Sequence, residues 1–385
     1  MQLVKRFLVV VCFLLLSSAL LPRTLPAARA QDAHKSGVPV YKVDPNWPRQ
    51  LPNNWILGQI GGMAVDKDDH IWVLHRPRSL TADEAAAAQT PPTADCCLPA
   101  PSVLEFDADG NLLKSWGGPA YIPDWPATEH GIVVDKSGNV WISGSGAANK
   151  DVPEDREIFK FTPDGTLLQE IGHHADGPDN NQDTGYFGRA AGMEVDDDAH
   201  EIYVADGYGN RRVVVYDSDT GAFKRGWGAY GIPLSEIENG KLPPYDPAAP
   251  PSKQFANPVH CVHISADALV YVCDRVNDRI QVFTKQGKFV KEFQVAPKTL
   301  RNGSVWTLNF SHDPQQKYLL VGDGANQVIW ILNRSDGAVV GSFGHSGRNA
   351  GQFHWLHQAA MDSQGNLYTG EVDTGKRIQK FLLQK

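Results

Sequence analysis

The stretch IVVDKSGNVWISG (residues 132–144) consists of a β-branched run, a polar turn around Asp, Gly and Asn, and a second β-branched and aromatic run. Such runs around a Gly-Asn turn predict two antiparallel strands joined as a hairpin. The same pattern occurs in five other places. The copies are MAVDKDDHIWVLH (63–75), MEVDDDAHEIYVAD (193–206), VHISADALVYVCD (262–274), LNFSHDPQQKYLLVGDG (308–324) and AAMDSQGNLYTGE (359–371).

A second hairpin pattern follows the first five copies, as in VLEFDADGNLLKSW (103–116) and IQVFTKQGKFVKEF (280–293). Four strands per unit and six units predict an all-β fold, a six-bladed β-propeller. The sixth unit stops early, at residues 377–385. We expect the segment VPVYKVD (38–44) to supply its fourth strand and close the ring. A two-sheet sandwich would not need six such units.

The first thirty residues are predicted to be a cleaved signal peptide, and residues 31–385 a single propeller domain. Lys5 and Arg6 precede an apolar run at residues 7–21, and Ala-Arg-Ala at 28–30 is a small-residue cleavage site. We therefore expect a secreted or periplasmic protein with no membrane insertion after cleavage. Loss of the leader's four positive charges takes the formal net charge from −8 to −12, which disfavours nucleic acid as a partner.

Two long, proline- and alanine-rich insertions, residues 81–102 and 232–253, are predicted to cover one face of the ring. The first contains Cys96 and Cys97. This adjacent pair could bind a soft metal, form a disulfide with each other, or pair with another loop. Export would make disulfides available without requiring them.

Three histidines share one register in different repeats. His130, His260 and His357 each stand five residues before the turn residue of their own repeat, in repeats two, four and six. Alternate blades of a six-bladed ring stand about 120° apart, so side chains at the start of their innermost strands would converge on the axis. The same register holds Gly61 and Ala191 in repeats one and three, which leaves the channel open. We predict a three-histidine metal site with an open fourth position. Zinc is the default, although copper, iron or cobalt would also fit.

Three more polar side chains stand where second strands end. The second strand of each repeat returns to the face where the first begins, so Arg76, Tyr208 and Arg275 are expected around the same axial mouth. Arginine forks suit a carboxylate, and a phenol beside cations ionises more easily and can act as a general base. The sequence therefore predicts a small carboxylate-bearing substrate.

At these residues the chain resembles the peptidyl-α-hydroxyglycine α-amidating lyases, which are six-bladed propellers of the NHL-repeat type. The resemblance covers most of the chain from residue 58 onward. Its most specific segments are HRP (75–77), HGI (130–132), VADGYGNRRVV (204–214), PVHCV (258–262), CDRVNDRIQVF (273–283) and WLHQ (355–358).

The resemblance implies a metal-dependent lyase that cleaves an N-acyl-α-hydroxyglycine into an amide and glyoxylate. It implies that the three histidines bind zinc, that Arg76 and Arg275 are catalytic, and that Tyr208 is the catalytic tyrosine. It also implies a calcium ion on the axis, held by the backbone carbonyls of Met63 and Ile132 and by an aspartate after the third histidine.

The chain departs from the family pattern at three places. Gln358 replaces that aspartate, and a neutral amide oxygen is a weaker calcium ligand than a carboxylate. Trp355 replaces a methionine near the metal, so a narrower or reshaped pocket is expected. Cys261 and Cys273 do not occupy the family's disulfide positions.

Two other classes of function stay open. A non-catalytic propeller of the NHL type would bind a protein or small-molecule partner through the same face, and no metal would copurify with it. A lactonase-like hydrolase would centre on an axial carboxylate and calcium, whereas this axis is predicted to carry histidines.

Overall fold

Aspartate side chains shape the hairpin turns of the repeats. Asp135 follows the first strand of its hairpin, and its Oδ1 accepts hydrogen bonds from the backbone amides of Ser137 (3.0 Å) and Asn139 (2.8 Å). Asp362 makes the equivalent pair of bonds in the sixth repeat. A carboxylate that satisfies two turn amides stabilises the tight reversal between two strands.

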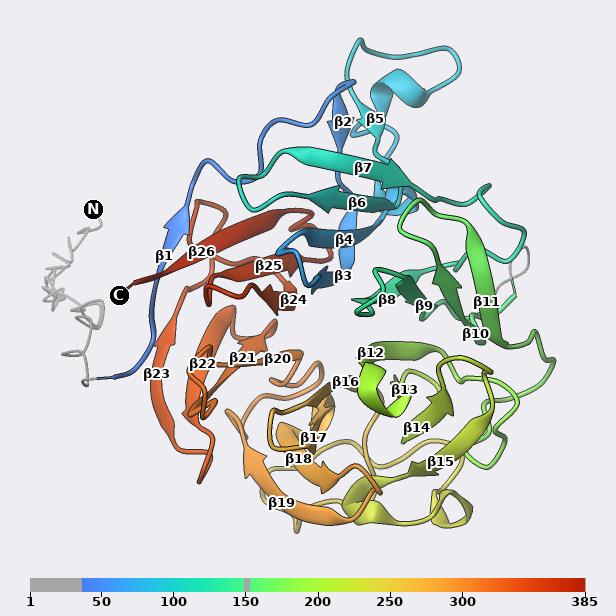
Figure 1. Ribbon diagram of the computed structural model, residues 1–385, viewed down its shortest axis with the longest axis vertical. Helices are drawn as coiled ribbons and strands as arrows, with labels where there is room; N and C mark the ends of the chain where they lie inside the picture. Colours follow the sequence, from blue (N-terminus) through green and yellow to red (C-terminus); the bar gives the residue numbers. More distant parts are fainter. Residues whose placement is uncertain (1–36, 149–152, 385) are drawn as a thin grey trace, which may run out of the picture. The chain divides into compact units, whose positions relative to one another are not determined.

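These hairpins assemble into six four-stranded sheets, the blades of a propeller, in a computed structural model that describes residues 37–148 and 153–384 (Figure 1). The predicted signal peptide lies outside the described residues. Within each blade the paired strands are antiparallel. They are also consecutive along the chain, except that a short strand intervenes between the second and third strands of blade one and that the first strand of the chain pairs with the last at the ring closure. The all-β, six-bladed prediction is confirmed.

The first three blades follow the chain from the innermost strand outward. Blade one consists of β3 (Gln59–Val65), β4 (Ile71–Arg76), β6 (Val103–Phe106) and β7 (Leu112–Trp116). Blade two consists of β8 (Glu129–Val134), β9 (Val140–Gly144), β10 (Glu157–Phe161) and β11 (Leu167–Gly172). Blade three consists of β12 (Ala190–Asp196), β13 (Glu201–Asp206), β14 (Arg212–Asp217) and β15 (Phe223–Trp227).

The last three blades complete the ring. Blade four consists of β16 (Val259–Ile264), β17 (Leu269–Asp274), β18 (Arg279–Thr284) and β19 (Phe289–Gln294). Blade five consists of β20 (Thr307–Phe310), β21 (Tyr318–Asp323), β22 (Val328–Asn333) and β23 (Val339–Phe343). Blade six consists of β24 (Leu356–Met361), β25 (Leu367–Glu371), β26 (Ile378–Gln384) and β1 (Val40–Asp44).

The N-terminal strand β1 closes the ring. It pairs antiparallel with β26, so that Val40 lies opposite Gln384 and Asp44 opposite Lys380. The two strands run side by side at the rim in Figure 1. The prediction that residues 38–44 supply the fourth strand of blade six is confirmed.

The hydrophobic core is divided into six layers, each between two neighbouring blades. Successive side chains of a strand point to opposite faces of its sheet. In β13, for example, Tyr203 and Ala205 pack towards blade four, whereas Ile202 and Val204 pack towards blade two. Each blade is therefore stabilised by both of its neighbours, and only the complete ring satisfies all six layers.

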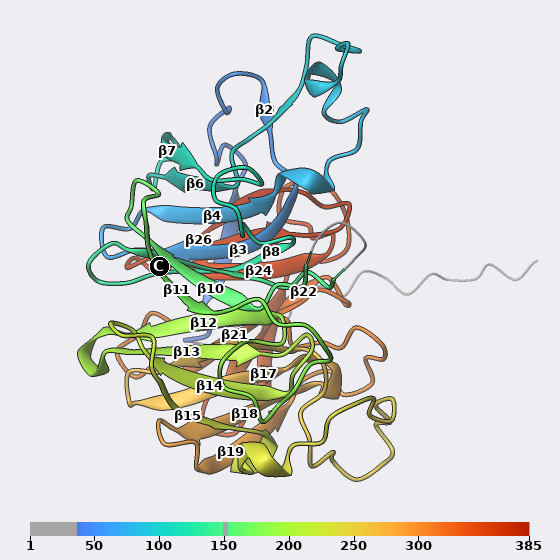
Figure 2. The ribbon, with the colours of Figure 1, turned by 90° about the vertical axis from the view of Figure 1, so that its right-hand side faces the viewer.

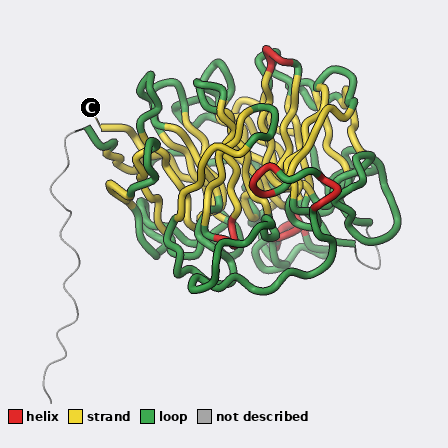
Figure 3. Tube along the Cα trace, turned by 90° about the horizontal axis from the view of Figure 1, so that it is seen from below, coloured by secondary structure: helices red, strands yellow, loops and turns green. Residues whose placement is uncertain are grey.

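The long insertions extend from one face of the ring. The loop that contains residues 81–102 follows β4, and residues 232–253 lie between β15 and β16, so both leave the face where innermost strands begin (Figure 2). In Figure 3 the strands span the ring between two layers of loops. Cys96 and Cys97 form a disulfide with each other, and a second disulfide joins Cys261 of β16 to Cys273 of β17.

The remaining regular elements are short. A two-stranded parallel sheet of β2 (Trp55–Ile56) and β5 (Leu98–Pro99) lies beside blade one. The helices among the described residues are single 3-10 turns, so none of them could cross a bilayer. They are η1 (Pro77–Ser79), η2 (Ala86–Ala88), η3 (Asp197–Ala199), η4 (Ala229–Gly231), η5 (Leu234–Glu236) and η6 (Arg275–Asn277).

Candidate metal centre and active site

Each of the three predicted metal ligands is the second residue of an innermost strand. His130 lies in β8, His260 in β16 and His357 in β24, which belong to blades two, four and six. The register between each of these strands and its neighbour shifts at the histidine. Such bulges re-aim a side chain out of the regular alternation of a strand. In blades two, four and six these bulges lie at the same position along the innermost strand.

The three imidazoles meet on the axis. One ring nitrogen of each histidine lies within 4.8 Å of the corresponding nitrogens of the other two, and the ring centroids are 4.9 to 5.0 Å apart. All three side chains are buried. The convergence predicted from the repeat register is therefore present in the structure.

In His260 and His357, a hydrogen bond at Nδ1 leaves the lone pair of Nε2 free to bind a metal ion. Nδ1 of His357 lies 3.0 Å from the carbonyl oxygen of Ile60, and Nδ1 of His260 contacts that of Trp306. Because a carbonyl can only accept, both Nδ1 atoms carry the proton, and each Nε2 keeps its lone pair. Metal-binding histidines are held in this way. Among the residues that the structure describes, Nε2 of His260 and Nδ1 of His130 are buried and have no hydrogen-bond partner, so the residues present fit a metal ion.

The surroundings keep the imidazoles neutral. Burial is the largest cause that lowers the pKa of each of the three histidines well below its ordinary value. Neighbouring histidines and the arginines Arg76 and Arg275 act in the same direction. Only a neutral imidazole binds a metal ion, so these environments prepare the ligands near neutral pH.

Tyr208 reaches the histidines from blade three. It follows β13, and its hydroxyl oxygen lies 2.9 Å from Nε2 of His130. The ring centroids of Tyr208 and His130 are 4.9 Å apart. The predicted general base is thus in hydrogen-bond contact with a predicted metal ligand.

The two predicted arginines flank this centre. Arg76 donates from Nε to the carbonyl oxygen of Glu129 (2.7 Å) and from Nη1 to Oε1 of Gln59 (2.9 Å). The guanidinium of Arg275 stacks 4.3 Å from the centroid of the Trp306 ring, and its Nε is buried without a partner. Burial is the largest cause that lowers the pKa of both arginines, although a guanidinium stays charged in proteins. Two half-buried cations without a carboxylate partner in hydrogen-bond contact, among the described residues, favour an anionic ligand.

Sequence comparisons find relatives over most of the chain. No protein-family model matches it. Peptidyl-alpha-hydroxyglycine alpha-amidating lyase 1 of Drosophila melanogaster is 26% identical over 382 residues, which cover 94% of this chain and 62% of that protein. NHL repeat-containing protein 3 of Mus musculus is 27% identical over 365 residues, 89% of this chain and 84% of that protein. The chain is therefore similar in sequence to proteins of both names.

Longer relatives match with the same part of this chain. Peptidyl-glycine alpha-amidating monooxygenase B of Xenopus laevis is 25% identical over 354 residues, 89% of this chain but 35% of that protein. The chain therefore spans about a third of the length of the amidating monooxygenases that it matches. A structure of virginiamycin B lyase from Staphylococcus aureus aligns over 90% of this chain and 89% of that chain, with 15% identity and a TM-score of 0.49. The fold assignment rests on the sheet topology.

Two tryptophans lie beside the histidines, and only one of them was predicted. Trp355, which replaces a family methionine, has its ring centroid 6.1 Å from that of Trp306. Trp306 itself lies 5.9 Å from both His260 and His357. Sequence reasoning missed Trp306, although it stands five residues before Ser311 and so holds, in repeat five, the register of the histidines.

The predicted calcium ligands are only partly brought together. Met63 and Ile132 line an axial cavity of about 530 Å³ on the far side of the histidines, whose wall also includes Met193, His263 and Ala359. Gln358 is not among the residues that line this cavity. A second ion held by Met63, Ile132 and Gln358 stays a prediction.

Proposed function

We propose that the protein is an exported, metal-dependent lyase that cleaves the C–N bond of an N-acyl-α-hydroxyglycine, or a closely similar carbinolamine, to an amide and glyoxylate. One observation carries the proposal: the hydroxyl of Tyr208 contacts His130 within a cluster of three neutral, buried imidazoles. Relatives that are named amidating lyases support this choice of chemistry.

The three histidines would hold the ion, for which we propose zinc. When bound, zinc supplies Lewis-acid polarisation of a substrate oxygen. The chain's own residues do the rest. Arg76 and Arg275 bind the substrate carboxylate, which places the carbinol carbon beside Tyr208. Buried guanidinium groups also stabilise negative charge that develops on oxygen.

Tyr208 moves the proton. As a general base, its phenolate accepts the proton of the substrate hydroxyl. The electron pair of the O–H bond forms the carbonyl of glyoxylate, and the pair of the C–N bond leaves with the amide nitrogen. Return of the proton from Tyr208 to that nitrogen gives the amide and restores the base, so the reaction balances without an oxidant or a second substrate.

Release of glyoxylate from a simple N-acyl-α-hydroxyglycine tests the proposal. The mature protein is assayed with and without a chelator, beside the variants Tyr208→Phe and His260→Ala. The lyase is supported if the wild-type protein releases glyoxylate, if a chelator abolishes this release, and if both variants fail to release glyoxylate. A wild-type protein that binds one metal per chain yet releases no glyoxylate contradicts the substrate. A protein with neither metal nor activity is a binding propeller of the NHL type.

We also propose that the protein is exported, by cleavage after Ala30. N-terminal sequencing of the protein recovered outside the cytoplasm would then begin at Gln31. A mature protein that retains residues 1–30 would contradict this.

A further inference from the structure

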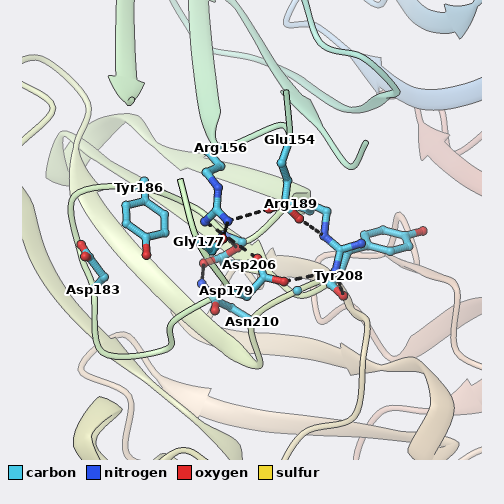
Figure 4. Close-up of polar contacts among 12 residues, drawn as sticks. Glu154, Arg156, Gly177, Asp179, Asp183, Tyr186, Arg189, Asp206, Tyr208 and Asn210 are labelled. Carbon is cyan, nitrogen blue, oxygen red and sulfur yellow. Dashed lines mark hydrogen bonds and ion pairs between the residues drawn. The ribbon is translucent and has the colours of Figure 1, made fainter. Parts of the chain in front are cut away.

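A charged network lies directly behind Tyr208. It consists of Glu154, Arg156, Asp179 and Arg189, and Figure 4 shows the Tyr208 ring pointing away from it. None of these four residues belongs to the predicted site, and none was singled out by the repeats. Their contacts nevertheless end on the backbone of the proposed base.

Arg189 holds Tyr208 at both backbone polar groups. The Tyr208 amide donates to the carbonyl oxygen of Arg189 (3.2 Å), and Nη2 of Arg189 donates to the carbonyl oxygen of Tyr208 (3.0 Å). Arg189 has a φ of +62°, a left-handed conformation that is uncommon for residues other than glycine. This conformation lets one residue present both its carbonyl and its side chain to the same neighbour.

Two carboxylates form ion pairs with the Arg189 guanidinium. Its Nη2 donates a hydrogen bond to Oδ2 of Asp179 (3.3 Å), and its Nε lies 2.8 Å from Oε1 of Glu154 as an ion pair without hydrogen-bond geometry. Arg156 shares both acids, at 2.6 Å from Glu154 and 4.0 Å from Asp179. The network has no net charge because it contains two cations and two anions. It can therefore stay partly buried while Nη2 of Arg189 points at the Tyr208 carbonyl oxygen.

The loop that carries Tyr208 has little freedom. A side chain at Gly209 would overlap the carboxylate of Asp179, so the backbone passes directly against the network. Asn257 supports the loop from blade four, through Nδ2 at 2.9 Å from the Gly207 carbonyl oxygen and 3.4 Å from that of Tyr208. The bond from Arg189 is the shorter of these two bonds to the Tyr208 carbonyl.

We infer that Arg189 is a positioning residue, which sets the Tyr208 hydroxyl against His130 through the Tyr208 backbone. The inference rests on the proposed function in taking Tyr208 as the base, although the placement of the hydroxyl can be measured without catalysis. Arg156 provides a matched control. It shares Glu154 and Asp179 with Arg189, but its remaining bond goes to the carbonyl oxygen of Gly177 (2.7 Å) rather than to Tyr208.

The test compares Arg189→Gln, Arg189→Lys and Arg156→Gln in the full mature protein. Because misplacing a catalytic group by about 1 Å can cost about 100-fold, we expect Arg189→Gln to lower kcat at least about ten-fold while KM stays within about two-fold. Arg156→Gln should keep kcat within about three-fold, since Tyr208 keeps both of its bonds to Arg189. Arg189→Lys, which retains the positive charge that pairs with Glu154 and Asp179, should lie between wild type and Arg189→Gln.

A second measurement is independent of activity. The chain is labelled with ¹³Cζ-tyrosine, and the Tyr208 resonance is identified by its loss in Tyr208→Phe. We expect that resonance to move in Arg189→Gln and to stay in place in Arg156→Gln. Equal effects of the two variants, or a Tyr208 resonance that does not move in Arg189→Gln, overturn the inference. If the wild-type protein releases no glyoxylate, the proposed function fails and the resonance alone decides.

Discussion

Gly207 allows blades three and four to approach each other beside the proposed active site, and we expect that Gly207→Ala disables that site. A Cβ atom at this position would lie 2.6 Å from the carbonyl carbon of Val259 and closer still to its oxygen. Carbon atoms in contact are about 3.5 Å apart, so the two backbones would have to separate by about 1 Å. Tyr208 follows Gly207 and Val259 precedes His260, so the separation displaces both the proposed base and a proposed metal ligand.

A displacement of about 1 Å predicts a loss in kcat of about 100-fold. Overpacking of this kind costs about 1–3 kcal/mol, which lowers Tm by several degrees. The assays are glyoxylate release and thermal unfolding. Gly341→Ala on β23 is the control, because its Cβ would meet no atom nearer than 3.4 Å. A Gly207→Ala protein with wild-type kcat and Tm, or a control that loses as much, would refute the reasoning.

Three more predictions concern the proposed metal ligand His260, the tryptophan Trp306 and the buried acid Asp278. His260→Ala should reduce bound zinc from about one per chain to below about 0.1 by mass spectrometry of the purified protein, whereas Trp306→Leu should retain the metal. Trp306→Leu should instead raise KM about three- to thirty-fold in glyoxylate release, because Arg275 loses its stacked ring; an unchanged KM would contradict the stacking role. Burial raises the pKa of Asp278 to about 7, so the folded protein binds its proton more tightly than the unfolded chain and loses stability as pH rises from about 4 to about 7. Asp278→Asn keeps the acceptor for the Ser304 amide (2.9 Å), so it should raise Tm by a few degrees at pH 8 and hardly at all below pH 4; a gain of equal size at both pH values would rule out the titration.

The sequence could predict features that repeat along the chain. Period-two runs around Asp/Gly turns predicted the hairpins, and counting them predicted the blades and the role of residues 38–44. The histidines at positions 130, 260 and 357 could be paired in space because a shared register in alternate blades is enough to locate a side chain on the axis. The same rule, applied to repeat five, would have selected Trp306.

The contacts behind Tyr208 could not be predicted in this way. Glu154 and Asp179 come from irregular segments between strands, and Asn257 comes from the long connection into blade four. No periodicity relates these positions, and their partners are fixed by how loops of different length fold over one face.

Blade six joins the two ends of the described chain, and this has a consequence for the timing of synthesis. A growing chain carries His130 and His260 long before His357 emerges, and β24 has no complete sheet to join until β26 meets β1. If the three histidines hold a metal ion as proposed, a polypeptide that ends before residue 357 would offer two imidazoles, one fewer than a three-histidine site needs. Under that proposal, metal uptake would distinguish the molecules whose ring includes β24, and the metal content of a preparation would count them.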